Sequence, residues 1–217
     1  MVLYIIRHAD PDYENNTITD FGWEEANALA DWLKDFRIDK IYTSPMGRAI
    51  DTATPTCKVK EIDYEILPWA AESMDYMEGW HMTPNDTMSY SFSSQKGIYD
   101  FEDFYESDRM KTIESMVKSS DEFLASLGYE RQGAFYKITK PNNSHIAVFC
   151  HGGFGAAWIA HLLNTAPATI YPQIRINTTS VTKFVFENEE DGYTRPTLKH
   201  LGQIDHIRRA GLRENNR

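Results

Sequence analysis

Two apolar runs, each followed at once by a histidine, dominate the hydrophobic pattern of this chain. Residues 2–6 and 146–150 are continuous apolar stretches, typical of strands that are buried on both faces of a sheet. The first run leads into Arg7 and His8, and the second leads into His151. Because ligands bind at the carboxyl ends of strands in open α/β sheets, we expect both histidines at one edge of one sheet.

Helical spacing of apolar residues follows each of these strands. Thr19 or Asp20 is expected to cap a helix whose apolar positions continue to Phe36. A short strand is predicted at 40–43, and another helix begins at Gly152. The alternation of strands and helices indicates an α/β protein.

A serine–proline pair predicts one more helix start. Ser44 followed by Pro45 is typical of an N-cap with proline at the first helical position. This helix carries Arg48 in its first turn. It is expected to end before Pro55, because proline disfavours helical geometry in the residue that precedes it.

The middle of the chain loses this regular alternation. Residues 73–131 are rich in Met, Tyr, Trp, Ser and Asp and include one amphipathic helix through 113–127, which ends at Gly128. We interpret 73–131 as a cap inserted over one edge of the sheet. The core is then expected to resume with a strand at 135–138.

Residues 181–186 and 195–201 are separated by the short acidic segment 189–192, which ends in a glycine, and together they predict a closing hairpin. Together the elements predict a three-layer α/β sandwich with a mostly parallel central sheet, helices on both faces and an inserted cap. We expect residues 1–217 to form a single domain, since this length suffices for one α/β unit with an insertion.

Composition narrows the class of ligand. The chain has 22 Lys and Arg against 32 Asp and Glu, and the resulting net charge of −10 argues against binding to nucleic acid or to anionic membranes. No apolar stretch approaches the roughly 18–20 residues of a membrane span, and no signal-like segment is present, so we expect a soluble, cytoplasmic protein. The basic residues of 208–217 are expected to form a frayed tail.

The cysteines and the remaining histidines suggest no metal or cofactor. Cys57 and Cys150 are too few for a disulfide scaffold and lack metal-site spacing. Cys150 is interpreted as a small buried strand residue, with a reactive thiol as the alternative. The other histidines also show no metal-ligand spacing.

The residues that converge at the expected sheet edge suit a phosphate group. Arg7, Arg48, His8 and His151 come together there with two helix N-termini, which favour anions. Guanidinium groups stay charged and can grip phosphate oxygens in pairs, and a neutral imidazole is a good nucleophile near neutral pH. Such a pocket can transfer a phosphoryl group without a metal ion.

Four ordered segments resemble a known family. Residues 4–9, Tyr-Ile-Ile-Arg-His-Ala, resemble the Arg-His-Gly signature of the histidine phosphatase superfamily, the phosphoglycerate-mutase-like group. Residues 43–53 are similar to its Ser-Pro-x-x-Arg-Ala-x-x-Thr-Ala segment, and 19–26 to its Leu-Thr-x-x-Gly-x-x-Gln-Ala helix start. Residues 150–153, Cys-His-Gly-Gly, resemble its second histidine block.

The resemblance implies a role for each site residue. His8 would be the nucleophile that becomes phosphorylated, while Arg7, Arg48 and His151 would hold the phosphoryl oxygens. Glu72, in Leu-Pro-Trp-Ala-Ala-Glu, stands where the family's general acid usually follows the third core strand.

The acid and the substrate remain open at this level. Glu78, in Met-Glu-Gly-Trp, is the second candidate acid, and a solvated surface glutamate is the alternative for Glu72. Ala9 replaces the usual glycine, and Pro11 and Glu14 replace the Ser or Thr and the Asn of the phosphoglycerate branch. These departures favour hydrolysis over a mutase reaction.

The leading hypothesis is therefore a metal-independent phosphatase that hydrolyses phosphomonoesters of small molecules through a phosphohistidine. A phosphoglycerate-type mutase and a protein phosphohistidine phosphatase are alternatives of the same class. A catalytically silent protein that binds phosphorylated ligands is the alternative of another class.

Overall fold

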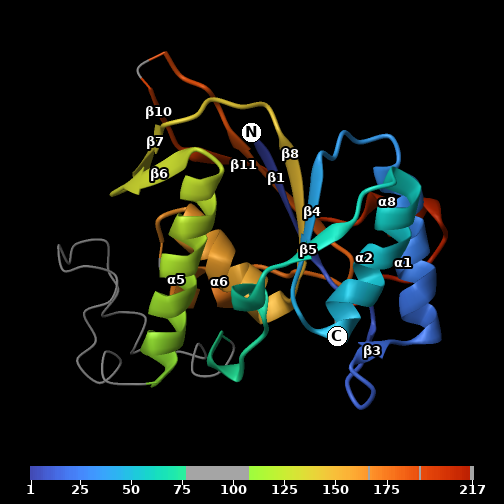
Figure 1. Cartoon of the computed structure of the whole chain (residues 1–217). Coiled ribbons are helices and arrows are strands. Elements are labelled where there is room, and N and C mark those ends of the chain that lie inside the picture. The colour runs from blue at the N-terminus through green and yellow to red at the C-terminus, as the bar shows by residue number, and fades with distance from the viewer. Residues whose placement is uncertain (77–107, 166, 191, 216–217) are drawn as a thin grey trace.

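The computed structural model describes residues 1–76, 108–165, 167–190 and 192–215, and its centre is a six-stranded sheet (Figure 1). The strands lie in the order β11 (Pro196–Gln203), β9 (Val181–Phe186), β1 (Val2–Arg7), β8 (His145–Cys150), β4 (Lys40–Thr43) and β5 (Tyr64–Ile66). Strands β1, β8, β4 and β5 are parallel, while β9 is antiparallel to both β1 and β11. The predicted mostly parallel sheet and the closing hairpin are both confirmed.

Helices cover both faces of this sheet, as the sequence predicts. On one face lie α1 (Asp20–Leu33) and α2 (Gly47–Lys60), and on the other lie α5 (Asp108–Ser126) and α6 (Gly152–Leu162). The described residues also form the short helices α7 (Pro167–Ile170) and α8 (Asp205–Arg209) and the 3-10 turns η1 (Pro68–Ala70), η2 (Met74–Tyr76) and η3 (Tyr171–Gln173).

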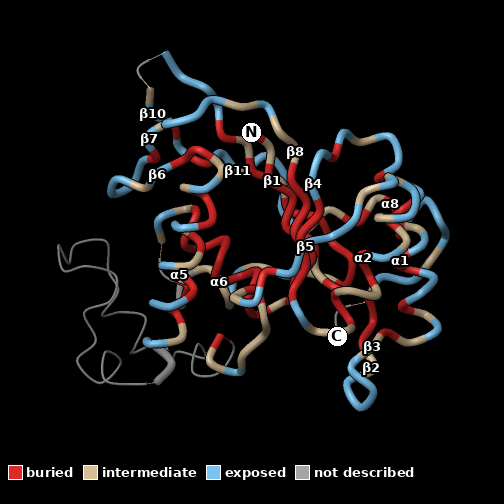
Figure 2. The backbone as a smooth tube through the Cα atoms, viewed as in Figure 1, coloured by how far each residue is buried: buried red, intermediate tan, exposed pale blue. Residues whose placement is uncertain are grey.

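Strand β1 shows how the two layers of core arise. Successive side chains of a strand point to opposite faces. Leu3 and Ile5 belong to the hydrophobic cluster under α5 and α6, whereas Tyr4 and Ile6 belong to the cluster under α1 and α2. Figure 2 shows the central strands as continuous buried segments, in agreement with the apolar runs of the sequence.

The first helix follows its sequence signal. Thr19 is the N-cap of α1, with extended backbone geometry, and its hydroxyl accepts a hydrogen bond from the N–H of Gly22 at 3.0 Å. The apolar face from Ala26 to Leu33 is buried.

Both predicted ends of the second helix are wrong. Helix α2 begins after Met46, because the backbone N–H of Ser44 still bonds to the carbonyl of Phe149 at 2.9 Å and prolongs the β4 ladder. The helix also continues through Pro55 to Lys60. A proline removes one N–H donor, and the buried residues around it hold α2 against α1, so packing outweighs the local preference.

The strand predicted to resume the core lies elsewhere. Strand β7 (Phe135–Ile138) forms a second, three-stranded sheet with β6 (Tyr129–Gln132) and β10 (Tyr193–Thr194). Gln132 pairs directly with Phe135, so β6 and β7 form a hairpin with a two-residue turn. Gly133 at φ 63° supplies the left-handed geometry of this turn.

Only part of the predicted cap, 73–131, can be compared with the structure. Residues 77–107 and the side chain of Glu78 lie outside the described residues. The described part contains α5, followed by Gly128 at φ 95° as the sequence predicts. Among the described helices, none combines the length and apolar character needed to cross a bilayer.

The C-terminal segment is not the frayed tail that its basic residues suggest, at least as far as Asn215. The carbonyl of Asn215 accepts from the N–H of Thr178 at 3.3 Å, and its amide donates to Asp10 at 2.5 Å. The guanidinium of Arg213 lies 4.8 Å from the centre of the Phe21 ring. The C-terminus therefore returns to the edge of the sheet where β1 ends (Figure 1).

Candidate active site

Hydrogen bonding beyond the strand ends brings the two histidines side by side. In the parallel ladder Arg7 is opposite Cys150, and the N–H of His8 then bonds to the carbonyl of Cys150 at 2.9 Å. The imidazole rings of His8 and His151 lie 5.2 Å apart, centre to centre. The register of β1 on β8 is thus what places both residues at one point of the sheet edge, as expected.

His8 has a defined tautomer. Its Nδ1 lies 2.7 Å from the carbonyl oxygen of Ala9, and since a carbonyl only accepts, Nδ1 carries the hydrogen. Burial and the charge of Arg7 lower the pKa of His8 from 6.5 to about 3, so the ring is neutral at neutral pH. Nε2 of His8 consequently keeps its lone pair, as a nucleophile requires.

His151 is completely buried and lies behind the surface of the pocket. Its Nε2 is 2.7 Å from the hydroxyl of Ser44, and its Nδ1 has no hydrogen-bond partner among the described residues. Burial, with the neighbouring ring of His8 as the next cause, lowers the pKa of His151 to about 2. Ser44, expected from the sequence to cap a helix, instead contacts this histidine.

The side chain of Arg7 lies at the same edge of the sheet, between the 171–177 segment and the start of α6. One of its Nη atoms donates to the carbonyl of Ile176 at 2.6 Å. A Cβ atom placed on Gly152 would lie 3.2 Å from Nε of Arg7, so the glycine lets the guanidinium approach the start of α6. Burial lowers the pKa of Arg7, but arginine remains charged at neutral pH.

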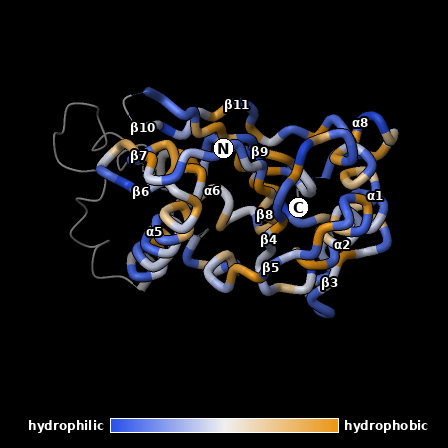
Figure 3. Tube along the Cα trace, turned by 45° about the horizontal axis from the view of Figure 1, so that its top comes forward, coloured by the Kyte–Doolittle hydropathy of each residue, from blue (hydrophilic) through white to orange (hydrophobic). Residues whose placement is uncertain are grey.

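Arg48 projects from the first turn of α2, as the sequence predicts. Its Nη1 donates to the side-chain oxygen of Asn16 at 3.4 Å, and its guanidinium carbon lies 5.4 Å from the centre of the Tyr13 ring. Tyr13 and Asn16 belong to the hydrophilic loop between β2 (Pro11–Asp12) and β3 (Thr17–Ile18), the blue loop beside β3 in Figure 3. Nε of Arg48 is buried without a hydrogen-bond partner among the described residues.

Glu72 closes the N-terminus of α6. Its carboxylate accepts from the backbone N–H of Gly153 at 3.0 Å and of Phe154 at 2.8 Å, which His151, the formal N-cap, leaves without a side-chain bond. Burial raises the pKa of Glu72, while the two N–H groups act in the opposite direction. A glutamate with a raised pKa in a pocket is suited to donate a proton.

A buried carboxylate supports the segment that follows His8. Glu25 of α1 accepts from the backbone N–H of Asp10 at 2.7 Å and from the hydroxyl of Thr178 at 2.5 Å. The N–H of Ala9 donates to Thr52 of α2 at 2.9 Å. Ala9 is not among the residues with positive φ, so alanine at this position carries no backbone strain. The segment that follows His8 is therefore held by both helices of one layer, α1 and α2.

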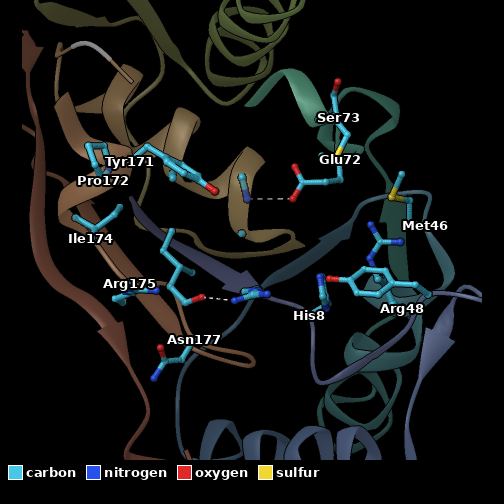
Figure 4. Close-up of a pocket in the computed structure, with 17 residues that line it drawn as sticks. His8, Met46, Arg48, Glu72, Ser73, Tyr171, Pro172, Ile174, Arg175 and Asn177 are labelled. Atoms are coloured by element: carbon cyan, nitrogen blue, oxygen red, sulfur yellow. Dashed lines mark hydrogen bonds between the residues drawn. The ribbon is translucent and has the colours of Figure 1, made fainter. Parts of the chain in front are cut away.

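The side chains face a cavity of about 710 Å³. Arg7, His8, Arg48 and Glu72 line it, whereas Glu78 lies outside the described residues. In Figure 4, His8 and Arg48 lie on one wall and Glu72 on another.

The opposite wall was not foreseen from the sequence. It is formed by residues 171–177, among them Tyr171, Arg175 and Asn177 (Figure 4). Its place depends on strand pairing, which the hydrophobic pattern does not encode: β9 pairs antiparallel with β1, and Val181 lies opposite Ile6. Residues that precede such a strand necessarily arrive at the edge where β1 ends.

Residues 3–198 match the sequence model of the histidine phosphatase superfamily, branch 1. The chain belongs to this superfamily. The resemblance of the four motifs is thereby confirmed. No curated protein sequence matches the chain significantly.

Several solved structures share the fold of this histidine phosphatase. Phosphoserine phosphatase from Entamoeba histolytica, in complex with 3-phosphoglyceric acid, has a TM-score of 0.64 and 20% identity, covering 95% of this chain and 98% of its own. Phosphoglycerate mutase from Bacillus anthracis has a TM-score of 0.63 and 19% identity, and the match covers 97% of this chain and 96% of the mutase. A mycobacterial glucosyl-3-phosphoglycerate phosphatase in complex with VO3 has a TM-score of 0.60 and 17% identity, and the match covers 92% of this chain and 97% of that phosphatase.

Proposed function

We propose that this histidine phosphatase hydrolyses phosphomonoesters of small molecules through a phosphohistidine at His8, without a metal ion. The observation that carries the proposal is the hydrogen bond from Nδ1 of His8 to the Ala9 carbonyl, which leaves Nε2 unprotonated. The guanidinium groups of Arg7 and Arg48 line the same cavity and can stabilise the charge of the phosphoryl group in the transition state.

The reaction has two steps. First, Nε2 of His8 attacks phosphorus, the bond to the leaving oxygen breaks, and Glu72 gives its proton to that oxygen. Second, a water molecule attacks the phosphohistidine, Glu72 takes a proton from the water, and phosphate leaves. Arg7, Arg48 and His151 are assigned to the phosphoryl oxygens throughout.

The size of the cavity and the relatives support a small substrate. A volume of about 710 Å³ is within the usual range for small-molecule sites. The Entamoeba histolytica structures hold phosphoserine or 3-phosphoglyceric acid, both of which carry a carboxylate beside the phosphate. Arg175 supplies a further cation on the wall opposite His8, suited to such a second anionic group.

We also propose that residues 73–131 form a cap on a single domain of residues 1–217. Two described residues support this: Ser73 and Met74, at the start of the cap, both line the cavity. The side chains of this cap would then select among phosphorylated substrates.

The test of the proposed function is a trapped intermediate. Phosphoryl-labelled substrate is mixed with enzyme and quenched in alkali, because phosphohistidine is stable in base and labile in acid. Label is expected on His8, and His8→Ala should abolish both label and turnover. His145→Ala, at the opposite end of β8, is the matched control and should retain both. Label on His151, or full turnover by His8→Ala, would refute the assignment.

A further inference from the structure

Ser44 occupies a position from which it can control the second histidine. Its backbone is fixed at the end of β4 by the 2.9 Å bond to the carbonyl of Phe149, one residue beyond the pair that Thr43 forms with Phe149 of β8. Ser44 and His151 are both completely buried, and the 2.7 Å between Ser44 Oγ and His151 Nε2 is a normal hydrogen-bond length. Water does not compete for either group.

The hydrogen atoms at this contact can be assigned from the partners of each group. A serine hydroxyl has one proton to donate and lone pairs that accept. The N–H of Met46 donates to Ser44 Oγ at 3.3 Å, so one lone pair is in use. Among the described residues, His151 Nε2 is the acceptor within reach of the remaining hydroxyl proton.

We propose that Ser44 is a positioning residue whose hydroxyl donates to Nε2 of His151 and thereby fixes this imidazole as the Nδ1–H tautomer. The reverse arrangement, with Nε2–H donating to Ser44, leaves the buried serine proton without an acceptor among the described residues. It would also leave His151 with a bare Nδ1, which repels a phosphoryl oxygen.

The fixed tautomer decides which atom of His151 can contact the phosphoryl group in the proposed reaction, on which this inference rests. Nδ1 of His151 is buried and has no hydrogen-bond partner among the described residues, yet its ring lies beside that of His8. With the tautomer fixed, this atom is a donor that lacks an acceptor. An oxygen of a phosphoryl group on His8 supplies one, so a neutral His151 can stabilise the transferring group.

The two histidines are therefore set in the same tautomer by different partners. A backbone carbonyl, that of Ala9, holds the hydrogen on Nδ1 of His8, where Nε2 must attack. A side-chain hydroxyl, that of Ser44, holds it on Nδ1 of His151, where Nδ1 must donate. One ring acts through its lone pair and the other through its N–H.

The first test reads the tautomer directly and does not depend on activity. Nitrogen NMR of the full chain labelled in its histidines distinguishes protonated from bare ring nitrogens. The wild type without ligand should show His151 protonated at Nδ1. Ser44→Ala should lose that preference, and Ser44→Thr, which keeps the hydroxyl, should restore it. A wild-type His151 protonated at Nε2 would overturn the proposal.

The second test measures turnover. Ser44→Ala should lower kcat by roughly 10-fold to 100-fold, the range found when partners that orient metal-bound histidines are removed. KM should change much less, and Ser44→Thr should recover most of the loss. Ser180→Ala, which removes a buried hydroxyl without a hydrogen-bond partner among the described residues, is the matched control and should keep wild-type kcat.

The possible outcomes distinguish a failure of the Ser44 proposal from a failure of the proposed function. If Ser44→Ala shifts the tautomer but leaves kcat unchanged, Ser44 is not a positioning residue. If the tautomers are as assigned and Ser44→Ala lowers kcat, yet no label is trapped on His8, the Ser44 assignment stands and the phosphohistidine mechanism fails.

Discussion

The role of Glu72 as general acid can be tested by a substitution that removes its ability to donate a proton and changes little else. Glu72→Gln keeps the size of the side chain and one oxygen that can accept from the N-terminus of α6. If Glu72 protonates the leaving oxygen, alkyl phosphates, which have poor leaving groups, should slow by roughly 10²–10⁴-fold, the usual contribution of a general acid. p-Nitrophenyl phosphate needs little proton assistance and should slow by less than about tenfold.

The structure also predicts that this variant stays folded. Glutamine gives up one of the two bonds to the Gly153 and Phe154 N–H groups, a loss of about 1 kcal/mol. Opposing this, folding raises the pKa of Glu72. The carboxyl group therefore stabilises the fold below pH 4.5, and this contribution is lost as the pH rises through the raised pKa, so at neutral pH an uncharged amide relieves a cost. We expect Tm to stay within about 4 °C of the wild type.

The assay compares kcat/KM for both substrate types in the wild type and in the variants Glu72→Gln, Glu65→Gln and Glu78→Gln. Glu65→Gln removes the same charge from the exposed strand β5 and should leave both rates unchanged. Equal losses of Glu72→Gln on alkyl and aryl phosphates would refute the role of general acid. A larger difference between the two substrates in Glu78→Gln would transfer the role to Glu78.

Three further predictions concern the metal ion, the charge of the histidines and the far wall. Hydrolysis should proceed in excess chelator and be blocked by vanadate, since no three His, Cys, Asp or Glu side chains among the described residues converge as metal ligands; loss of activity that a divalent ion restores would contradict this. His8 should stay neutral in an NMR titration from pH 8 to pH 5, because its pKa is lowered to about 3. The contribution of the neutral ring to the free energy of unfolding should be lost as the pH falls from 6.5 towards 3. A titration midpoint near 6.5 would show that burial and Arg7 do not lower this pKa. Arg175→Ala should raise KM for phosphomonoesters that carry a carboxylate and leave KM for p-nitrophenyl phosphate unchanged, and equal effects on both would remove Arg175 from substrate recognition.

The sequence predicts the sheet edge well because the chemistry and the strand pattern agree there. The apolar runs of β1 and β8 end at His8 and His151, and a parallel register with Arg7 opposite Cys150 is enough to make the rings neighbours. Arg48 is placed nearly as well, since it depends only on which helix follows β4.

Sequence reasoning fails where a side chain has a choice of partners. Ser44 has the local signal of an N-cap, but its backbone continues the strand ladder and its hydroxyl contacts His151, a residue 107 positions away. Pro55 has the local signal of a helix end, yet α2 is held by its packing. The wall at 171–177 depends on the pairing of β9 with β1, which hydrophobic alternation does not encode.

The burial and the charges of the site explain why its histidines can act as neutral groups. Burial is the main cause that lowers the pKa of both His8 and His151, and the guanidinium groups assigned to hold the phosphate act in the same direction, so a second proton is kept off each ring. When a phosphate dianion enters, it offsets the charge of Arg7 and Arg48, and protonation of His8 Nε2 becomes easier. Attack on phosphorus must therefore follow binding without an intervening proton transfer to Nε2. The tautomer held by Ala9 supports this order, because Nδ1 already carries the one proton that the neutral ring needs. The acid that serves the leaving group must then come from another residue, and Glu72, whose pKa is shifted upward, is the described carboxyl group on the wall of the cavity with that property.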